Sequence, residues 1–376
     1  MMPEACPHRP ACPGCPHYGE SGVDADALGL LRIVAAEMRV ALDPVLEGEA
    51  SGFRRRARLA VRGRASSPKI GIFEQGSHRV VDIPRCPVQH PRINAVAREL
   101  RESMRLLGVT PYNESSHRGL LRYVQVVVER STGDVQVVLV ANDHAPASLE
   151  PLADELARRL EGRLQGLWWN GNTGTGNAIL GSEWTLLRGR DAVEETIGGA
   201  RVFFPPGAFG QSNLALADRL VDDVQARVAP GAVVAELYCG VGAFGLGLAQ
   251  RGHEVRFNEV SPHGLEGLRR GLACLGEGAA ARTTVVEGEA SGAVSLLHGA
   301  DAVVVDPPRK GLDEAVVGAL VRERPGQLLY VSCNPRSLGR DVGQLCGGGF
   351  TLKRLTPYAM FPYTTHVETV AEFVAG

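Results

Sequence analysis

The chain has 376 residues, of which 44% are hydrophobic, and a formal net charge of −2. This composition excludes a disordered chain, and the length favours two domains over one. The near-neutral charge argues against a protein that coats nucleic acid through its overall field, but it allows a local basic face. No apolar run approaches the ~20 residues that span a bilayer, and the N-terminus lacks the pattern of a secretory signal. We therefore expect a cytoplasmic protein without membrane contacts.

The first motif is a proline-rich loop that contains cysteines. Cys6, Cys12 and Cys15 form a C-x5-C-x2-C run, and Cys86 follows in Arg85-Cys86-Pro87. In a reducing compartment, cysteines at such spacing indicate metal binding rather than disulfides. Four thiolates suit either tetrahedral zinc or an iron-sulfur cluster, and the spacing alone does not choose between them. Fortuitous cysteines are the remaining alternative.

The next segments predict a helix followed by a β-rich middle. Leu28, Leu31, Ile33 and Ala36 recur at helical intervals and predict a helix over residues 24–42. Alternating apolar runs then predict antiparallel strands at residues 58–61, 80–83, 123–128 and 135–140. Another helix is predicted over residues 152–160.

A basic run lies at the start of this β-rich part. It comprises Arg54, Arg55, Arg56, Arg58, Arg62, Arg64 and Lys69. Solvated surface is the commoner role of such a cluster, and phosphate contact is the alternative. The alternation in Arg58-Leu59-Ala60-Val61-Arg62 predicts a strand that presents Arg58 and Arg62 on one side.

From about residue 208 the pattern changes to strand, glycine turn and helix. Apolar runs predict strands at residues 232–238, 255–258, 284–287, 302–305 and 328–331. This alternation predicts a doubly wound, mostly parallel sheet, in which ligands bind at the carboxyl ends of the strands. Glu259, Asp306 and Cys333 all fall at such ends.

Gly240-x-Gly242-x-x-Gly245 matches a dinucleotide fingerprint, and Glu259 lies near the distance at which an acidic residue binds ribose. This motif alone is therefore also compatible with an NAD-dependent oxidoreductase. A purely steric role for the glycines is a further alternative. The rest of this half favours a different enzyme. A Pro307-Pro308 loop, a soft nucleophile at Cys333 and a late carboxylate suit methyl transfer to an unreactive pyrimidine carbon.

The chain closely resembles the bacterial RNA (uracil-5-)-methyltransferases that use S-adenosylmethionine. The matching segments are Phe209-Gly210-Gln211-Ser212-Asn213, Glu236-Leu237-Tyr238-Cys239-Gly240-Val241-Gly242-Ala243-Phe244, Asn258-Glu259, Asp306-Pro307-Pro308-Arg309-Lys310-Gly311, Ser332-Cys333-Asn334-Pro335 and Phe361-Pro362-x-Thr364-x-His366-x-Glu368. The resemblance extends to the four cysteines and to Thr110-Pro111-Tyr112-Asn113, so it covers nearly the whole chain.

This resemblance implies an α/β fold, with a class I Rossmann-like methyltransferase domain over residues 208–376. Residues 1–207 are expected to form an iron-sulfur loop and a β-rich central RNA-binding domain, with a helix near 24–45 packed on the catalytic domain. The cysteines resemble the [4Fe-4S] ligands of the 23S ribosomal RNA enzymes. No small β-barrel module is seen before them, and Thr110-Pro111-Tyr112-Asn113 is similar to the enzymes that modify uridine 747. We expect a monomer acting on 23S ribosomal RNA, with a dual-site or tRNA enzyme as alternatives.

By position within these motifs, the resemblance assigns S-adenosylmethionine binding to Gln211, Tyr238, Glu259 and Asp306. Cys333 is expected to add to C6 of uracil, and Glu368 to remove the C5 proton after methyl transfer. The target base is expected to flip out of the RNA into a pocket with walls from Pro308, Tyr358 and Phe361. An iron-sulfur RNA-binding protein with an inactive domain and an amino-group methyltransferase are the competing classes.

Overall fold

The computed structural model describes residues 5–20 and 22–376. The chain divides into two compact units, and each unit is assembled from separate stretches. The first unit contains residues 1–16, 49–195 and 210–214, and the second contains residues 17–48, 196–209 and 215–376. Each unit has its own sheet and its own core, so each is described by itself.

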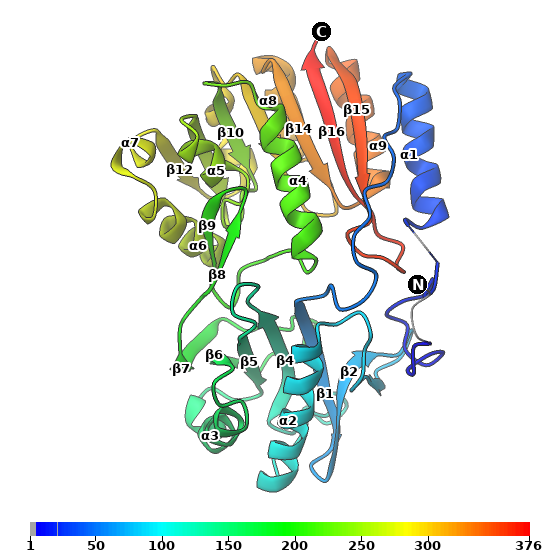
Figure 1. Cartoon of the computed structure of the whole chain (residues 1–376), viewed down its shortest axis with the longest axis vertical. Coiled ribbons are helices and arrows are strands. Elements are labelled where there is room, and N and C mark those ends of the chain that lie inside the picture. Colours follow the sequence, from blue (N-terminus) through cyan, green and yellow to red (C-terminus); the bar gives the residue numbers. More distant parts are fainter. Residues whose placement is uncertain (1–4, 21) are drawn as a thin grey trace. The chain divides into compact units, whose positions relative to one another are not determined.

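The first unit is built on a seven-stranded sheet in the order β3-β2-β1-β4-β5-β6-β7 (Figure 1). Its strands are β1 (Arg56–Arg64), β2 (Ser67–Phe73), β3 (Val80–Asp82), β4 (Leu121–Val128), β5 (Val135–Ala141), β6 (Leu164–Gly171) and β7 (Glu183–Gly189). The strands predicted from the sequence are confirmed, and they pair antiparallel. β5 and β6 pair parallel instead, because α3 (Glu150–Arg159) provides the crossover that parallel neighbours require.

Two helices cover one face of this sheet. They are α3 and α2 (Pro91–Leu107), and their apolar sides pack with alternate strand residues into one core. α2 is not among the helices predicted from the sequence, although Ile93, Val96, Ala97, Leu100 and Met104 recur at helical spacing and are all buried. His90 caps this helix, and Pro91 begins it.

The second unit contains a seven-stranded sheet in the order β12-β11-β10-β13-β14-β16-β15. Its strands are β10 (Val233–Leu237), β11 (Glu254–Glu259), β12 (Thr283–Glu287), β13 (Ala302–Val305), β14 (Gln327–Ser332), β15 (Phe350–Tyr358) and β16 (Glu368–Ala375). All pairs are parallel except those of β16, which runs antiparallel to β14 and β15. The expected doubly wound, mostly parallel sheet is confirmed.

Helices pack on both faces of this sheet. On one face, α1 (Ala25–Met38), α8 (Glu314–Glu323) and α9 (Pro335–Gly347) contribute to a core with β13, β14 and β16. The other face carries Glu236 and Phe257, which lie against α5 (Gly245–Gln250). α4 (Leu214–Arg227) is joined to the start of α5, since Gln225 Nε2 donates to the Phe244 carbonyl at 2.7 Å. α6 (Pro262–Ala273) follows β11, and β8 (Val193–Ile197) pairs with β9 (Ala200–Phe204) in a separate two-stranded sheet.

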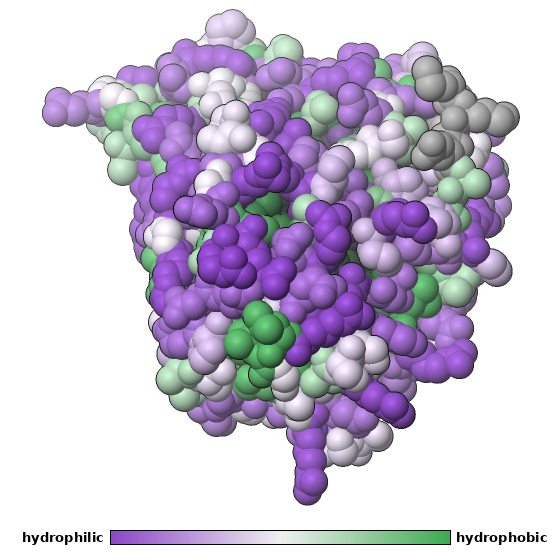
Figure 2. Space-filling model, turned by 60° about the horizontal axis from the view of Figure 1, so that its bottom comes forward, coloured by the Kyte–Doolittle hydropathy of each residue, from purple (hydrophilic) through white to green (hydrophobic). Residues whose placement is uncertain are grey.

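Across the described residues, no helix has both the length and the apolar character needed to cross a membrane. The face seen in Figure 2 is mostly hydrophilic, and its apolar side chains form small separate patches. Exposed large hydrophobic side chains include Leu106 and Leu107, at the end of α2.

Candidate active site

Strand pairing in the second unit brings the two predicted catalytic residues together. β14 and β16 are antiparallel, with Ser332 opposite Thr369. Cys333 follows Ser332 along the chain, and Glu368 precedes Thr369. Because the two strands run antiparallel, continuing the register by one residue places Cys333 beside Glu368. Glu368 is only 1% exposed, whereas Cys333 is partly accessible. A thiol open to a ligand therefore has a buried carboxyl as its neighbour.

Asp306 and Arg309 complete the charges around Cys333. Burial, followed by the charges of Glu368 and Asp306, raises the pKa of Cys333 to about 11, and Arg309 opposes this shift. Burial and the charge of Asp306 hold the pKa of Glu368 well above its usual range. These shifts oppose the thiolate form of Cys333 and the carboxylate form of Glu368 in the free protein. Arg309 is itself held by His366, since its guanidinium donates to Nε2 at 3.1 Å.

The glycine turn after β10 has an unusual backbone. Tyr238, Gly240 and Gly242 have φ values of 59°, 57° and 83°, which is the left-handed region that glycine adopts most readily. Space around the Cα of Gly240 is open, since a Cβ there would meet nothing within 4 Å. A ligand can therefore approach the backbone closely at this turn.

Glu259 fixes this turn from the neighbouring strand. Its carboxylate accepts hydrogen bonds from the N–H groups of Gly240 and Ser261, both at 2.7 Å, and it is 8% exposed. Asn258, the residue before it, ties β11 to the end of β12, because its Nδ2 donates to the carbonyls of Val286 and Gly288. Each Glu259 oxygen keeps a free lone pair, so the carboxylate can also accept from ribose hydroxyls.

One buried carboxyl at this end of the sheet was missed as a site candidate. Glu236 lies on β10, is 1% exposed, and neither of its oxygens has a hydrogen-bond partner of normal geometry. Burial, opposed by the nearby Gly245 N–H, raises its pKa to about 8, and Asp306 adds to the shift. The sequence could have identified it, because a glutamate within an apolar strand is rarely fully buried without a specific role.

The other predicted cofactor residues lie in different surroundings. Tyr238 follows β10, and its buried hydroxyl makes no hydrogen bond of normal geometry, while Asp313 is the nearest charged group. Gln211 belongs to the first unit, whereas Tyr238, Glu259 and Asp306 belong to the second. The place of Gln211 in the cofactor site therefore stays a prediction.

One expected wall of the base pocket is wrong. Tyr358 is fully buried at the end of β15, and its hydroxyl donates to Asp223 of α4 at 2.5 Å. A side chain enclosed in this way cannot line an open pocket. Phe361 and Pro308 remain candidates, since Pro308 is exposed and Phe361 is partly so.

The four cysteines of the predicted cluster, Cys6, Cys12, Cys15 and Cys86, all belong to the first unit. Burial, followed by the neighbouring thiols of Cys86 and Cys12, raises the pKa of Cys15 to about 12, and Cys6 adds a smaller effect. Three of these residues come from the loop before α1 and the fourth follows β3. Within residues 5–20 and 22–376, however, no group of three or more histidine, cysteine or acidic side chains is arranged to hold a metal ion. The expected cluster is therefore not shown.

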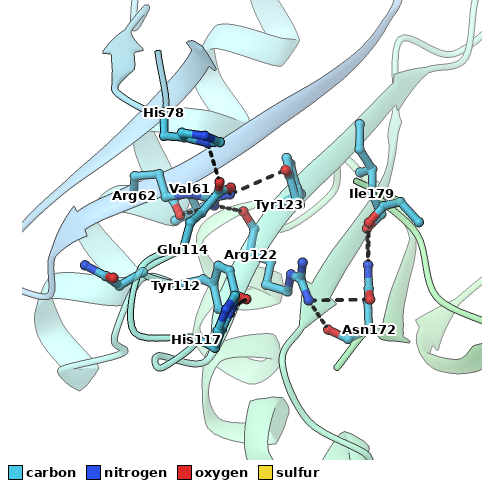
Figure 3. A network of polar contacts seen from close by, with 12 residues as sticks. Val61, Arg62, His78, Tyr112, Glu114, His117, Arg122, Tyr123, Asn172 and Ile179 are labelled. Atoms are coloured by element: carbon cyan, nitrogen blue, oxygen red, sulfur yellow. Dashed lines mark hydrogen bonds and ion pairs between the residues drawn. The ribbon is translucent and has the colours of Figure 1, made fainter. Parts of the chain in front are cut away.

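The basic run near β1 includes an arginine, Arg62, that is buried instead of exposed to solvent. Arg58 and Arg62 lie on the sheet face opposite α2 and α3, as the alternation predicts, but Arg62 is only 7% exposed. Its guanidinium pairs with Glu114, donates to the carbonyls of Val61 and Arg122, and lies over the ring of Tyr123 (Figure 3). The expectation of a solvated or phosphate-binding Arg62 is wrong, because this side chain is enclosed by its own fold.

A second buried arginine extends this polar network. Arg122 donates to the carbonyls of Asn172 at 2.7 Å and Gly174 at 2.5 Å, and it stacks over the ring of Tyr112 at 4.3 Å (Figure 3). The hydroxyl of Tyr112 bonds in turn to Nδ1 of His117 at 2.9 Å. The two arginines thus fix the loop between α2 and β4, which carries Thr110-Pro111-Tyr112-Asn113.

The chain is similar to known RNA methyltransferases. The model of the tRNA (uracil-5-)-methyltransferase family matches residues 296–373, which include Asp306, Cys333 and Glu368. An uncharacterized RNA methyltransferase of Protochlamydia amoebophila is 35% identical over 98% of this chain and 97% of its own length. An uncharacterized RNA methyltransferase of Halalkalibacterium halodurans is 31% identical over 85% of this chain and 70% of its own.

A solved structure matches the fold of nearly the whole chain. It is the Pyrococcus abyssi tRNA (uracil-54, C5)-methyltransferase in complex with S-adenosyl-L-homocysteine. The TM-score is 0.78, the sequences are 26% identical, and the match covers 97% of this chain and 86% of that one.

Proposed function

Because the chain belongs to the RNA (uracil-5-)-methyltransferase family, we propose that it methylates C5 of uridine 747 in 23S ribosomal RNA through a covalent adduct with Cys333. S-adenosylmethionine-dependent methylation of uracil in RNA is the activity common to this family and to the matched structure. The observation that carries the proposal is the strand register that brings Cys333 beside Glu368 at the carboxyl end of β14.

The chemistry requires both side chains. C5 of uracil is too weak a nucleophile to attack a sulfonium methyl group directly. Cys333 first loses its thiol proton to solvent, and the thiolate adds to C6. The resulting enolate carries electron density at C5, which takes the methyl group as its bond to the sulfonium sulfur breaks. Glu368 then accepts the C5 proton, the C5–C6 double bond re-forms, and the C6–S bond breaks to release Cys333.

Methyl donor binding belongs to the carboxyl ends of β10 and β11. We assign the ribose to Glu259 and the remaining contacts to Tyr238, Asp306 and Gln211. S-adenosylmethionine supplies the electrophilic methyl group when it is bound. The open backbone at Gly240 supports this assignment, since the turn leaves room for a ligand beside it.

The choice of 23S ribosomal RNA rests on the cysteines and on Thr110-Pro111-Tyr112-Asn113. We propose that Cys6, Cys12, Cys15 and Cys86 hold a [4Fe-4S] cluster that stabilises the first unit. The electrostatic effect of Cys86, Cys12 and Cys6 on the thiol of Cys15 supports this set. No proposed step of the reaction changes an oxidation state, so the cluster has a structural role. The tRNA target of the Pyrococcus abyssi enzyme makes tRNA the second candidate substrate.

The proposal predicts one methylated position. Anaerobically purified protein and S-adenosylmethionine should convert uridine 747 of a 23S transcript to 5-methyluridine, and mass-spectrometric mapping of 23S and tRNA transcripts measures this. A 5-fluorouridine transcript should trap a covalent protein-RNA adduct, because its C5 substituent cannot leave as a proton. Cys333→Ser should form no adduct, whereas Cys274→Ser, which changes an exposed cysteine, should behave as wild type.

Any different result would contradict a specific part of the proposal. Methylation of tRNA alone would overturn the ribosomal target and leave the chemistry. A second site in 23S RNA would show a dual-site enzyme. Adduct formation by Cys333→Ser would overturn the role of Cys333.

A further inference from the structure

Three side chains after Cys333 hold the backbone of the loop that follows β13. Asn334 Nδ2 donates to the Arg309 carbonyl at 2.9 Å, and Arg340 donates to the Lys310 carbonyl at 2.7 Å. The carboxylate of Asp341 accepts from the Leu312 N–H at 2.9 Å. Side chains from one short segment thus fix three nearly consecutive backbone groups of the loop.

Asp341 is the centre of this arrangement. It lies on α9 with an exposure of 0%. Besides Leu312, its Oδ2 accepts from the hydroxyl of Tyr330 at 2.7 Å, while its Oδ1 accepts from Arg340 Nε at 2.8 Å. A carboxyl this deeply buried is costly unless its acceptor positions are used, and here donors come from three elements, namely β14, α9 and the loop.

The approach of the loop to this pair is very close. Gly311 has a φ of 85°, and a Cβ on it would overlap Oδ2 of Asp341 and the guanidinium of Arg340. Only glycine fits that conformation and that space. The backbone is therefore shaped to bring the loop against Arg340 and Asp341.

We propose that Arg340 and Asp341 are positioning residues for the methyl transfer, because they set the loop that carries Asp306 and Arg309 against Cys333. This role rests on the proposed function, which makes Cys333 the nucleophile. Tyr330 lies on β14, and Cys333 directly follows the last residue of that strand. Asp341 therefore ties both the strand that leads to Cys333 and the loop after β13 to one carboxylate. Neither residue performs a chemical step.

The test removes the hydrogen bond from Arg340 to the loop without creating a cavity in the core. The side chain of Arg340 is 52% exposed, so Arg340→Gln should fold while losing its bond to the Lys310 carbonyl. We expect the single-turnover rate of adduct formation with 5-fluorouridine RNA to fall about 10- to 100-fold, since small misplacements of reacting groups cost that much. The KM for RNA should change less than about twofold, because the loop is misplaced rather than absent. Arg340 donates to both the Lys310 carbonyl and the Asp341 carboxylate. Arg340→Lys keeps a donor that reaches one of these two acceptors, so it should recover part of the rate of adduct formation.

Two further variants make the result specific. Asp341→Asn keeps an acceptor for Leu312 and Tyr330 but presents an amide to Arg340, so it should lower the adduct rate as Arg340→Gln does. Arg336→Gln removes a guanidinium from the same helix and should retain the wild-type rate. Wild-type rates in both Arg340→Gln and Asp341→Asn would overturn the proposal, as would an equal loss in Arg336→Gln.

A readout without RNA separates this proposal from the proposed function. The pH midpoint for alkylation of Cys333 by iodoacetamide depends on the positions of Asp306 and Arg309. A midpoint in Arg340→Gln that differs from wild type by about half a pH unit or more would support the positioning role even if wild-type protein formed no adduct. An unchanged midpoint would overturn the role, whereas absence of any wild-type adduct would overturn the proposed chemistry.

Discussion

At the scale of residues, the surroundings of Cys333 and Glu368 disfavour the charged form of each side chain. Burial and the charge of Asp306 raise the pKa of both groups, and the charge of Glu368 adds to the shift at Cys333. The proposed reaction needs the thiolate first and the carboxylate later. We infer that catalysis depends on the loss of a proton from Cys333 when RNA is bound, with Arg309 as the positive charge that favours it.

Alkylation of Cys333 measures this balance directly. With a pKa of about 11, the thiol should react slowly with iodoacetamide at pH 7, and the rate should rise about tenfold per pH unit up to that pKa. Glu368→Gln removes a neighbouring carboxylate that destabilises the thiolate, so the pKa of Cys333 should fall and alkylation at pH 9 should become faster. Peptide mapping by mass spectrometry measures the rate at each pH.

The exposed Cys274 provides the internal control, because its rate should not respond to Glu368→Gln. A wild-type Cys333 that reacts fully at pH 7 would contradict the raised pKa. An identical pH profile in Glu368→Gln would show that the carboxyl does not act on the thiol.

At the scale of elements, the turn after β10 uses each glycine for a different reason. Gly240 supplies a left-handed backbone with open space beside it, and Gly242 combines a φ of 83° with close contact to Leu268. Gly245 begins α5, where a Cβ would overlap the carboxyl of Glu236 and the ring of Phe257. The fingerprint therefore describes a packing requirement as much as a ligand site.

Gly245→Ala should destabilise the second unit. The added methyl group overlaps two buried side chains that have no room to move, and such overpacking typically costs about 1–3 kcal/mol of the free energy of unfolding. Urea denaturation monitored by circular dichroism measures the change.

Gly318→Ala is the matched control on α8. A Cβ at Gly318 meets nothing within 4 Å, and alanine favours a helix over glycine by up to about 1 kcal/mol, so this variant should be as stable as wild type or more so. Equal stability of Gly245→Ala and wild type would show that the helix shifts freely, against the packing described.

At the scale of the whole molecule, the chain builds two units from interleaved stretches. Residues 17–48 and 196–209 belong to the second unit, although residues 49–195 between them belong to the first. The proposed cluster would tie the N-terminal loop to Cys86, beyond β3, within the first unit. Its loss should therefore affect the first unit and spare the carboxyl ends of β10 and β11.

Cys86→Ser tests this separation. Anaerobically purified wild-type protein should contain iron and sulfide, and the variant should lose most of both while it still binds S-adenosylmethionine in isothermal titration calorimetry. Thermal unfolding should begin at a lower temperature, because the cluster no longer constrains the loop. Cys346→Ser changes a thiol on α9 of the second unit and should keep the wild-type iron content. Zinc in place of iron would select the alternative metal, and wild-type protein without any metal would overturn the cluster.

Local sequence patterns predicted much of the fold. The apolar runs at β10, β11, β13 and β14 and the helical spacing at α1 are properties of adjacent residues, so they are visible in the sequence. The missed helix α2 had an equally clear pattern. The parallel pairing of β5 with β6 had none, because pairing depends on the path of the chain between the strands.

The sequence by itself determined the family, the class of sheet and the residue types of the reaction, because short motifs record the chemistry that each position must perform. Only the tertiary structure decided which side chains meet. It placed Glu368 beside Cys333 through antiparallel pairing and enclosed Arg62 and Tyr358. It also gathered Tyr330, Leu312 and Arg340 around the carboxylate of Asp341. Burial and contact arise from residues far apart in the chain, so no local pattern specifies them.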